Sequence, residues 1–280
     1  MNKYSPTVLS HAFGYNVSML DFRSSTWMNL PDLKTDINEF ELPWQLLQNA
    51  KNMGIKKLTS CQSAFMTHFF QGNRSIDYIL HTPHLSGLTS GVAFCMIKYV
   101  MDYYEYDHTR PRTLSPMIIV MCEKDDAVNR TYNIFSQISV ASGVSVYNLR
   151  QRTWQTNIER CGNCDILVAT PFLIADLISA NKTNIERCGN CDILVATPFL
   201  IADLISANKI NLNRIRFIFV DWADKVYNAF QLPSTTNLVR YLGERNNAVR
   251  ILGCEHLYES RREYFAESCR DLPVEIRVQQ

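Results

Sequence analysis

The sequence lacks both a large excess of charge and a long apolar run, and these absences narrow what the protein can be. Its 280 residues carry 28 Lys and Arg against 27 Asp and Glu, a formal net charge of +1. A near-neutral chain has no overall attraction to nucleic acid, so any binding of RNA must come from a local patch. No segment approaches the roughly 18 apolar residues of a membrane span. The first 20 residues contain no apolar stretch either, so we expect neither a secretory signal nor a membrane anchor.

The cysteine content and the composition fit a globular domain in a reducing compartment. Nine cysteines occur without a secretory signal, which indicates free thiols. The apolar share of 46% and the charged share of 20% are ordinary, and the length suffices for one large or two small domains. We therefore expect a cytoplasmic or nuclear protein with a substantial core.

Apolar strand patterns alternate with helical patterns along most of the chain. Residues 1–35 are mixed in pattern and are expected to form an N-terminal extension. A helix is predicted to open at Leu42 and to end at Gly54. Strands are predicted at residues 76–80, 117–121, 144–147, 165–169, 217–220 and 249–252, and helices at residues 92–104, 127–138 and 172–179. Continuous apolar strands alternating with helices predict an α/β fold, a parallel sheet with helices on both faces.

A perfect tandem repeat lies inside this pattern, since residues 156–182 and 183–209 are identical over 27 residues. Solenoids are built from three or more units, so two identical copies indicate a recent duplication, a splice or a gene-model artefact. Each copy carries the same apolar strand, for which a sheet has one slot. Either one copy docks and the other is looped out, exposing Ile193, Leu194 and Val195, or the second strand extends the sheet.

The repeat also duplicates a Cys-x-x-Cys pair. The four cysteines are Cys161, Cys164, Cys188 and Cys191. Two such pairs resemble a four-cysteine zinc site, although residues 165–187 separate them more widely than is usual. Because the second pair exists only through the duplication, we expect no metal here, and a metal analysis of purified protein tests this.

Short motifs follow the predicted strands in a fixed order. They are the segments 54–62, 82–89, 122–126, 170–173, 221–224 and 253–255. With one repeat copy removed, residues 36–280 resemble, in the order and spacing of these motifs, the first RecA-like domain of a DEAD-box RNA helicase. The resemblance implies a RecA-like parallel sheet in a single P-loop NTPase-type domain. It also implies ATP and magnesium as ligands and RNA as a partner.

The first motif resembles the family's adenine-reading segment and contains Thr59 and Gln62. The amide of Gln62 carries two donors and one acceptor, which suits an adenine edge. A second interpretation stays open, in which Gln62 only caps the following helix.

The phosphate loop matches the family pattern in part. Ser86, Gly87 and Thr89 match, whereas Leu85 stands at the first glycine and Leu88 at the lysine. Such a loop works through backbone N–H groups brought close by glycine and through a lysine on the β and γ phosphates. Loss of one charge-assisted contact of roughly 1.5–3 kcal/mol should weaken phosphate binding by about tenfold or more.

The segment Asp221-Trp222-Ala223-Asp224 stands where the family has Asp-Glu-Ala-Asp. The resemblance implies that Asp221 holds magnesium and that Asp224 ties the loop to its neighbours. The Glu that should orient the attacking water is Trp222, whose indole can donate one N–H but cannot accept a proton. In the alternative interpretation Trp222 is a core indole and Asp221 caps a helix.

The family's coupling motif, Ser-Ala-Thr, is replaced by Gly253, Cys254 and Glu255. Both hydroxyl groups are therefore missing. We expect Glu255 to lie near Asp221 and Asp224, where its negative charge would disfavour a nucleotide phosphate.

The RNA-binding motifs are changed in the same direction. Lys124 keeps one positive charge, and the family's Thr-Pro-Gly-Arg site keeps only its threonine, Thr170 in one repeat copy and Thr197 in the other. The remaining phosphate donors are that hydroxyl and a helix N-terminus. Arg150 and Arg152 form a small basic cluster beside a tryptophan, which suits either RNA binding or a solvated surface.

These losses predict a catalytically degenerate domain that serves as a scaffold for RNA and proteins. Their pattern resembles that of the Yb-type helicase-like Tudor proteins of the piRNA pathway. That resemblance implies RNA-silencing partners, a second RecA-like or Tudor domain in a longer chain, and cytoplasmic, perinuclear or ribonucleoprotein granules. Two alternatives remain: a fragment of an ATP-dependent RNA helicase with residual nucleotide binding, and a zinc-stabilised interaction module. ATP turnover separates the first of these, and metal content the second.

Overall fold

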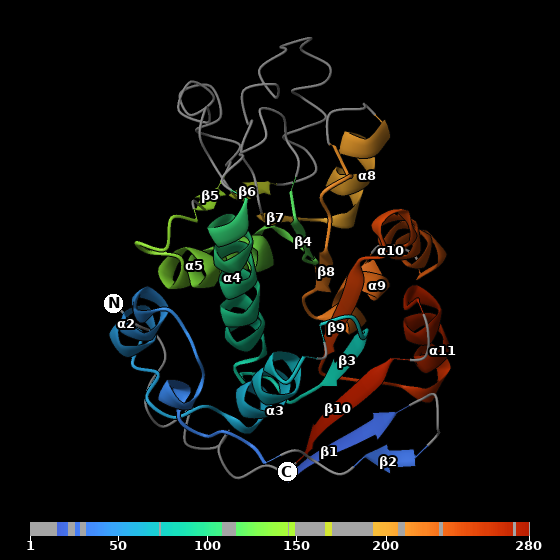
Figure 1. Cartoon of the computed structure of the whole chain (residues 1–280). Helices are drawn as coiled ribbons and strands as arrows, with labels where there is room; N and C mark the ends of the chain where they lie inside the picture. Colours follow the sequence, from blue (N-terminus) through green and yellow to red (C-terminus); the bar gives the residue numbers. More distant parts are fainter. Residues whose placement is uncertain are drawn as a thin grey trace.

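The computed structural model describes most of the chain. The described residues are 16–21, 26–28, 32–72, 74–107, 116–144, 146–148, 166–169, 193–206, 211–229, 232–270 and 273–279. They form one ten-stranded sheet with helices packed on both of its faces (Figure 1). The predicted α/β fold is therefore confirmed.

The strands of the sheet are in the order β2-β1-β10-β3-β9-β8-β4-β7-β6-β5. They are β1 (Asn16–Asp21), β2 (Thr26–Met28), β3 (Tyr78–His81), β4 (Ile118–Met121), β5 (Val146–Asn148), β6 (Ile166–Ala169), β7 (Ile193–Ala196), β8 (Phe217–Val220), β9 (Val249–Cys254) and β10 (Val274–Gln279). All neighbouring pairs from β10 to β5 are parallel, and β1 and β2 add an antiparallel edge. The carboxyl ends of the parallel strands consequently share one edge of the sheet, which is where such folds bind ligands.

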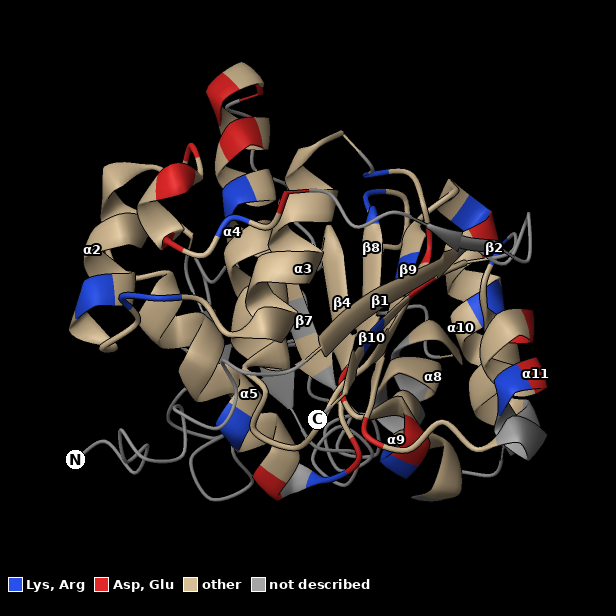
Figure 2. Ribbon diagram, turned by 90° about the horizontal axis from the view of Figure 1, so that it is seen from below, with Lys and Arg blue, Asp and Glu red and all other residues tan. Residues whose placement is uncertain are grey.

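The helices divide between the two faces. They are a 3-10 turn η2 (Ile37–Glu39), α2 (Trp44–Asn52), α3 (Ser60–Phe70), α4 (Leu88–Tyr106), α5 (Asp125–Ile138), α8 (Pro198–Ser206), α9 (Ala223–Ala229), α10 (Leu232–Asn246) and α11 (Glu259–Ser268). Helices α2 to α5 lie on one face and α8 to α11 on the other, in both views (Figures 1 and 2). None of these described helices is long and apolar enough to span a bilayer.

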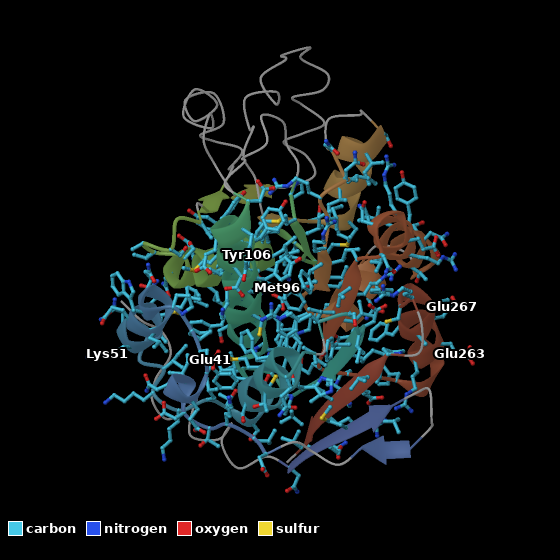
Figure 3. The ribbon with its side chains drawn as sticks, viewed as in Figure 1. Glu41, Lys51, Met96, Tyr106, Glu263 and Glu267 are labelled. Carbon is cyan, nitrogen blue, oxygen red and sulfur yellow. The ribbon has the colours of Figure 1, made fainter. Side chains whose placement is uncertain are left out.

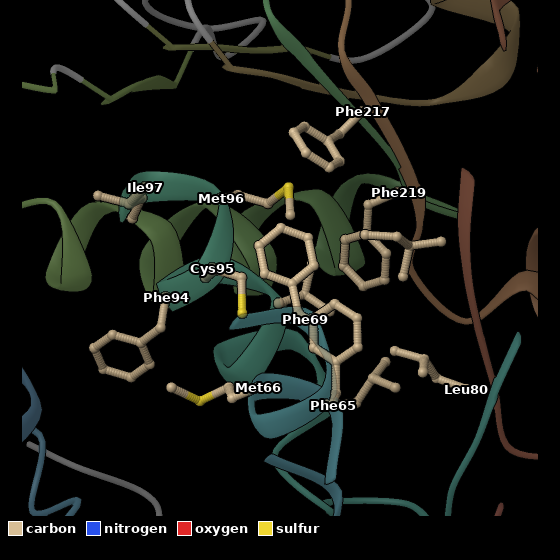
Figure 4. Packing of buried hydrophobic residues seen from close by; sticks show 14 of the residues in the cluster. Phe65, Met66, Phe69, Leu80, Phe94, Cys95, Met96, Ile97, Phe217 and Phe219 are labelled. Carbon is tan, nitrogen blue, oxygen red and sulfur yellow. The ribbon is translucent and has the colours of Figure 1, made fainter. Parts of the chain in front are cut away.

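The core lies between α3, α4 and the sheet, and aromatic rings fill much of it (Figure 4). The ring centroid of Phe69 lies 5.8 Å from that of Phe217, and Tyr99 meets Phe217 edge-on at 4.7 Å. Every residue of β4 and of β8 is buried, as expected for strands covered on both faces. Met96 lies inside the molecule, while Glu263 and Glu267 project from α11 (Figure 3).

The two repeat copies place their identical strands side by side. Strand β7 pairs with β4, and β6 pairs with β7 in register, so that Ile166 faces Ile193 and Ala169 faces Ala196. Ile193 and Val195 are fully buried. Of the two arrangements open from the sequence, the second is the one found, in which the additional strand extends the sheet.

The predicted strands are found with shifts of one or two residues, and the predicted helices at 92–104 and 127–138 fall within α4 and α5. The helix predicted at 172–179 lies outside the described residues. Strands β1 and β2 lie within residues 1–35, and β1 pairs with β10 over six residues. The N-terminal segment therefore contributes to the sheet, which the mixed sequence pattern did not indicate.

Candidate functional site

One cavity of about 750 Å³ lies against the carboxyl ends of β3, β4 and β8. Its lining includes every residue predicted for the nucleotide site, namely Thr59, Gln62, Ser86, Gly87, Leu88 and Thr89. From the segment 221–224 it includes Asp221 and Trp222. The sequence therefore predicted correctly which segments converge. The volume lies in the usual range for small-molecule sites.

The phosphate loop keeps its shape although its first glycine is replaced. Gly87 begins α4 with φ of 81°, and a Cβ there would lie 2.7 Å from Nε2 of Gln62, so only glycine fits. Leu85 also has a left-handed backbone, with φ of 59°, and its side chain is 42% exposed. That conformation costs a residue other than glycine roughly 1–2 kcal/mol. The loop thus holds a strained leucine where close approach to a phosphate requires glycine.

Leu88, at the lysine position, is packed into the protein. Its side chain is 3% exposed, and a Cβ on Gly253 would lie 2.5 Å from its Cδ2 atom. Leu88 therefore fills the space over β9 that a serine side chain at 253 would need. The two departures from the family pattern are in direct contact and fit one another.

The adenine-reading segment supports the phosphate loop. Thr59 and Gln62 form a capping box at the start of α3, in which the backbone N–H of Thr59 donates to Oε1 of Gln62 at 2.9 Å. Nε2 of Gln62 donates to Ser90 at 2.8 Å, and the Thr59 hydroxyl donates to the carbonyl of Ser86. Gln62 therefore caps α3 and also supports Ser90, while contact with an adenine stays a prediction.

Asp221 lies at the end of β8 and accepts hydrogen bonds from two threonines. The hydroxyl of Thr89 donates at 3.0 Å and that of Thr131, on α5, at 2.7 Å. Asp221 is 3% exposed, and burial raises the pKa of its carboxyl group to about 6. Its carboxylate therefore links α4 and α5 rather than capping α9. Thr131 was missed from the sequence, although Ala127 and Thr131 are spaced to share a helix face.

Trp222 has φ of 59° and is half-buried at the wall of the cavity. Its ring centroid lies 5.1 Å from that of His84, and Nζ of Lys225 lies 4.5 Å from the ring, a cation–π contact. The interpretation of Trp222 as a core indole is wrong, because the ring lines the cavity.

Glu255 lies next to Asp224, as expected, but its charge is paired. Its backbone N–H donates to Asp224 at 3.3 Å, and its carboxylate forms a 3.2 Å ion pair with Lys225. Glu255 is not among the residues that line the cavity. The ion pair weakens the expected repulsion of a phosphate, which stays a prediction. Cys254 is fully buried, and burial raises the pKa of its thiol well above the ordinary value.

The RNA-binding candidates are only partly described. Lys124 is exposed at the start of α5. Thr197 stands directly before α8, is 1% exposed, and its hydroxyl has no hydrogen-bond partner among the described residues. The other candidates, Thr170, Arg150, Arg152, Cys161, Cys164, Cys188 and Cys191, lie outside the described residues. Within the described part of the chain, no group of three or more metal-ligating side chains comes together.

ATP with magnesium, implied by the resemblance, fits this site only in part. The cavity volume and the glycine turn at Gly87 suit a nucleotide. Two positions do not suit a nucleotide with magnesium, because Leu88 stands at the position of the lysine and Trp222 at that of the water-orienting carboxylate. Both oxygens of Asp221 already accept hydrogen bonds within the protein.

No protein-family model and no curated protein matches the sequence, but solved structures match the fold. Yeast Prp28, a DEAD-box splicing factor, is 15% identical with a TM-score of 0.70, and the match covers 100% of this chain and 57% of Prp28. The RNA helicase Prp28 from Chaetomium thermophilum bound to ADP is 15% identical with a TM-score of 0.67, covering 100% and 58%.

A third similar structure is yeast Dbp5 bound to Gle1 and IP6, at 13% identity and a TM-score of 0.63, covering 86% of this chain and 52% of Dbp5. The chain thus spans between 52% and 58% of the length of these three neighbours. At such low identity the likeness establishes the fold alone. The chain has the fold of the RecA-like domains of DEAD-box helicases.

Proposed function

We propose that this chain is a helicase-like domain that has lost ATP hydrolysis and serves as a scaffold for RNA and proteins. The observation that carries the proposal is the surroundings of Asp221. Its carboxylate is bonded to Thr89 and Thr131, and the next residue is an indole that lines the cavity. Hydrolysis needs a group that accepts a proton or a hydrogen bond from the attacking water, and an indole N–H can only donate.

The packing around the cavity also supports a scaffold role. The contact of Leu88 with Gly253 and the capping box of Gln62 hold the loop from inside the protein. A loop held in this way does not depend on a phosphate for its shape. The domain should therefore present the same surface with or without nucleotide, as suits a constitutive docking module.

An RNA-binding role rests on the start of α8. The hydroxyl of Thr197 is buried without a partner in the described part of the chain, and a buried polar group left unpaired costs roughly 1–3 kcal/mol. A phosphate at the N-terminus of α8 would satisfy it and would also meet the free backbone N–H groups of that helix. Exposed Lys124 adds a cation. Acidic and basic side chains are mixed along α11 (Figure 2), so a general electrostatic attraction is not part of the proposal.

The biological setting is proposed from the sequence resemblance alone. Partners would be RNA-silencing factors of the piRNA type, together with a second RecA-like or Tudor domain of a longer chain. The location would be cytoplasmic or perinuclear granules.

The test is ATP turnover by the longest natural form of the protein, measured with and without single-stranded RNA. We expect no turnover above the rate without protein. Turnover that the substitution Asp221→Ala abolishes would establish an active helicase instead. RNA binding is measured separately by a filter or fluorescence assay with Thr197→Val, which keeps the shape of the side chain but removes the hydroxyl.

A further inference from the structure

One face of α5 looks into the cavity. The residues of α5 that line it are Ala127, Arg130, Thr131 and Ile134. Their spacing of three and four residues places them on one side of the helix. Thr131 reaches Asp221 with its hydroxyl at 2.7 Å. The neighbouring Arg130 lines the same cavity, as does Leu88.

Arg130 is a cation for which the described residues supply no close partner. It is exposed, and it has no hydrogen bond or ion pair with any other described residue. Its charge nevertheless acts on the carboxyl group of Asp221. An arginine that faces a cavity and lacks a carboxylate partner is available for an anion from outside, and its planar fork suits phosphate oxygens.

The whole cavity carries an excess of positive charge. Its charged lining consists of four cations and two acids: Lys56, Lys57, Arg130, Lys225, Glu123 and Asp221. Because Lys225 is paired with Glu255, the excess rests on Lys56, Lys57 and Arg130, which outnumber the two acids. The cavity has thus lost the lysine of its loop but has cations on its other walls. Excess positive charge in a concave site favours an anionic ligand.

We propose that the cavity binds a nucleoside diphosphate without magnesium, with Arg130 of α5 acting as the phosphate-binding cation in place of Leu88. The inference rests on the proposed loss of hydrolysis, because it describes a nucleotide that is retained and not turned over. In this proposal the guanidinium supplies the cation that contacts the phosphate, and no metal ion takes part. A metal ion bound directly to Asp221 would compete with the hydrogen bonds that its carboxylate accepts from Thr89 and Thr131.

The test measures displacement of a fluorescent ADP analogue by ADP, by pyrophosphate and by adenosine. Wild-type protein should bind ADP with a Kd below about 1 mM. The Kd in MgCl2 and the Kd in EDTA should agree within about twofold. Arg130→Ala should weaken ADP and pyrophosphate by roughly tenfold or more, the effect of one charge-assisted contact. Adenosine, which has no phosphate, should bind wild type and variant alike.

Three matched variants make the result specific. Arg130→Lys keeps the charge and should recover part of the affinity. Glu123→Gln removes an acid from the same cavity and should strengthen ADP binding, the opposite direction. Arg240→Ala removes an arginine from the surface of α10, where it contacts Asn237, and should change nothing. Since Arg130 and Glu123 make no described hydrogen bond, these variants should fold, and circular dichroism checks this.

The inference is overturned by three results: no binding of either ADP or pyrophosphate below 1 mM, binding that disappears in EDTA, or equal affinities for wild type and Arg130→Ala. Turnover of ATP in the same preparations would refute the proposed loss of hydrolysis. It would not decide the role of Arg130, which the binding measurements test. The two proposals therefore fail on separate measurements.

Discussion

The contact between Leu88 and Gly253 predicts a strong thermodynamic coupling between these two positions. A Cβ added at Gly253 would lie 2.5 Å from Cδ2 of Leu88, closer than any ordinary contact. Gly253→Ala alone should therefore overpack the site and cost about 1–3 kcal/mol. Leu88→Ala alone removes a side chain that is 3% exposed and should cost about 2–5 kcal/mol.

The double variant decides whether the contact is the cause. With Leu88 shortened to alanine, the added methyl group at 253 has room, and alanine in a strand is favoured over glycine by roughly 0.5–1 kcal/mol. Gly253→Ala should then be neutral or stabilising in the Leu88→Ala background. The two effects should deviate from additivity by more than about 1 kcal/mol.

Urea unfolding followed by circular dichroism measures all four members of this cycle, with the free energy taken from midpoints at a common slope. As a control, Gly143→Ala should cost the same in both backgrounds. Gly143 has φ of 77° and nothing within 4 Å of its Cβ position, so its cost comes from the backbone alone. Equal costs of Gly253→Ala in both backgrounds would refute the fitted pair.

Three further predictions follow from the site and the repeat. Burial raises the pKa of Asp221 from 3.8 to about 6, so the folded state binds a proton at this carboxyl group more tightly than the unfolded state does. The contribution of Asp221 should therefore make the protein less stable as the pH rises from about 4 to 6. Thermal melts of Asp221→Asn over this pH range should lack that loss of stability. Trp222→Glu alone should not produce ATP turnover in a phosphate-release assay, since Leu88 also departs from the family pattern; turnover would confine the loss to one residue. Deletion of residues 156–182 removes β6, which pairs with β7 on the side away from β4. The variant should remain a folded monomer with one strand fewer, as checked by circular dichroism and gel filtration. Aggregation of the variant would contradict this place of β6 in the sheet.

The sequence predicted the sheet and the convergence of the motifs because both depend on local patterns. Buried parallel strands appear as continuous apolar runs, and the run ending at Val220 is the clearest of them. Residues that follow such strands meet at one edge of the sheet. That rule was enough to bring Gln62, Gly87 and Asp221 to one cavity.

Contacts between distant side chains could not be predicted in the same way. Thr131 bonds Asp221 across 90 residues of sequence, and no local pattern specifies which polar residue of a helix will face a particular strand end. The antiparallel pairing of β1 with β10 was missed for a similar reason, since it depends on an edge left open by the rest of the sheet. The pairing of Glu255 with Lys225 weakens the argument that Glu255 repels a phosphate, because that argument considered Glu255 without its neighbour.

The substituted positions contact one another or other neighbours, and this explains how the fold persists without the family's site. Leu88 lies against Gly253, Trp222 contacts both His84 and Lys225, and Lys225 pairs with Glu255. Each replacement is thus satisfied inside the protein. Restoring a single family residue would break one of these contacts before it supplied any chemistry, so single reversions should destabilise rather than activate. By contrast, the hydroxyl of Thr197 is buried and has no partner among the described residues, and the proposed binding of RNA rests on that unsatisfied group.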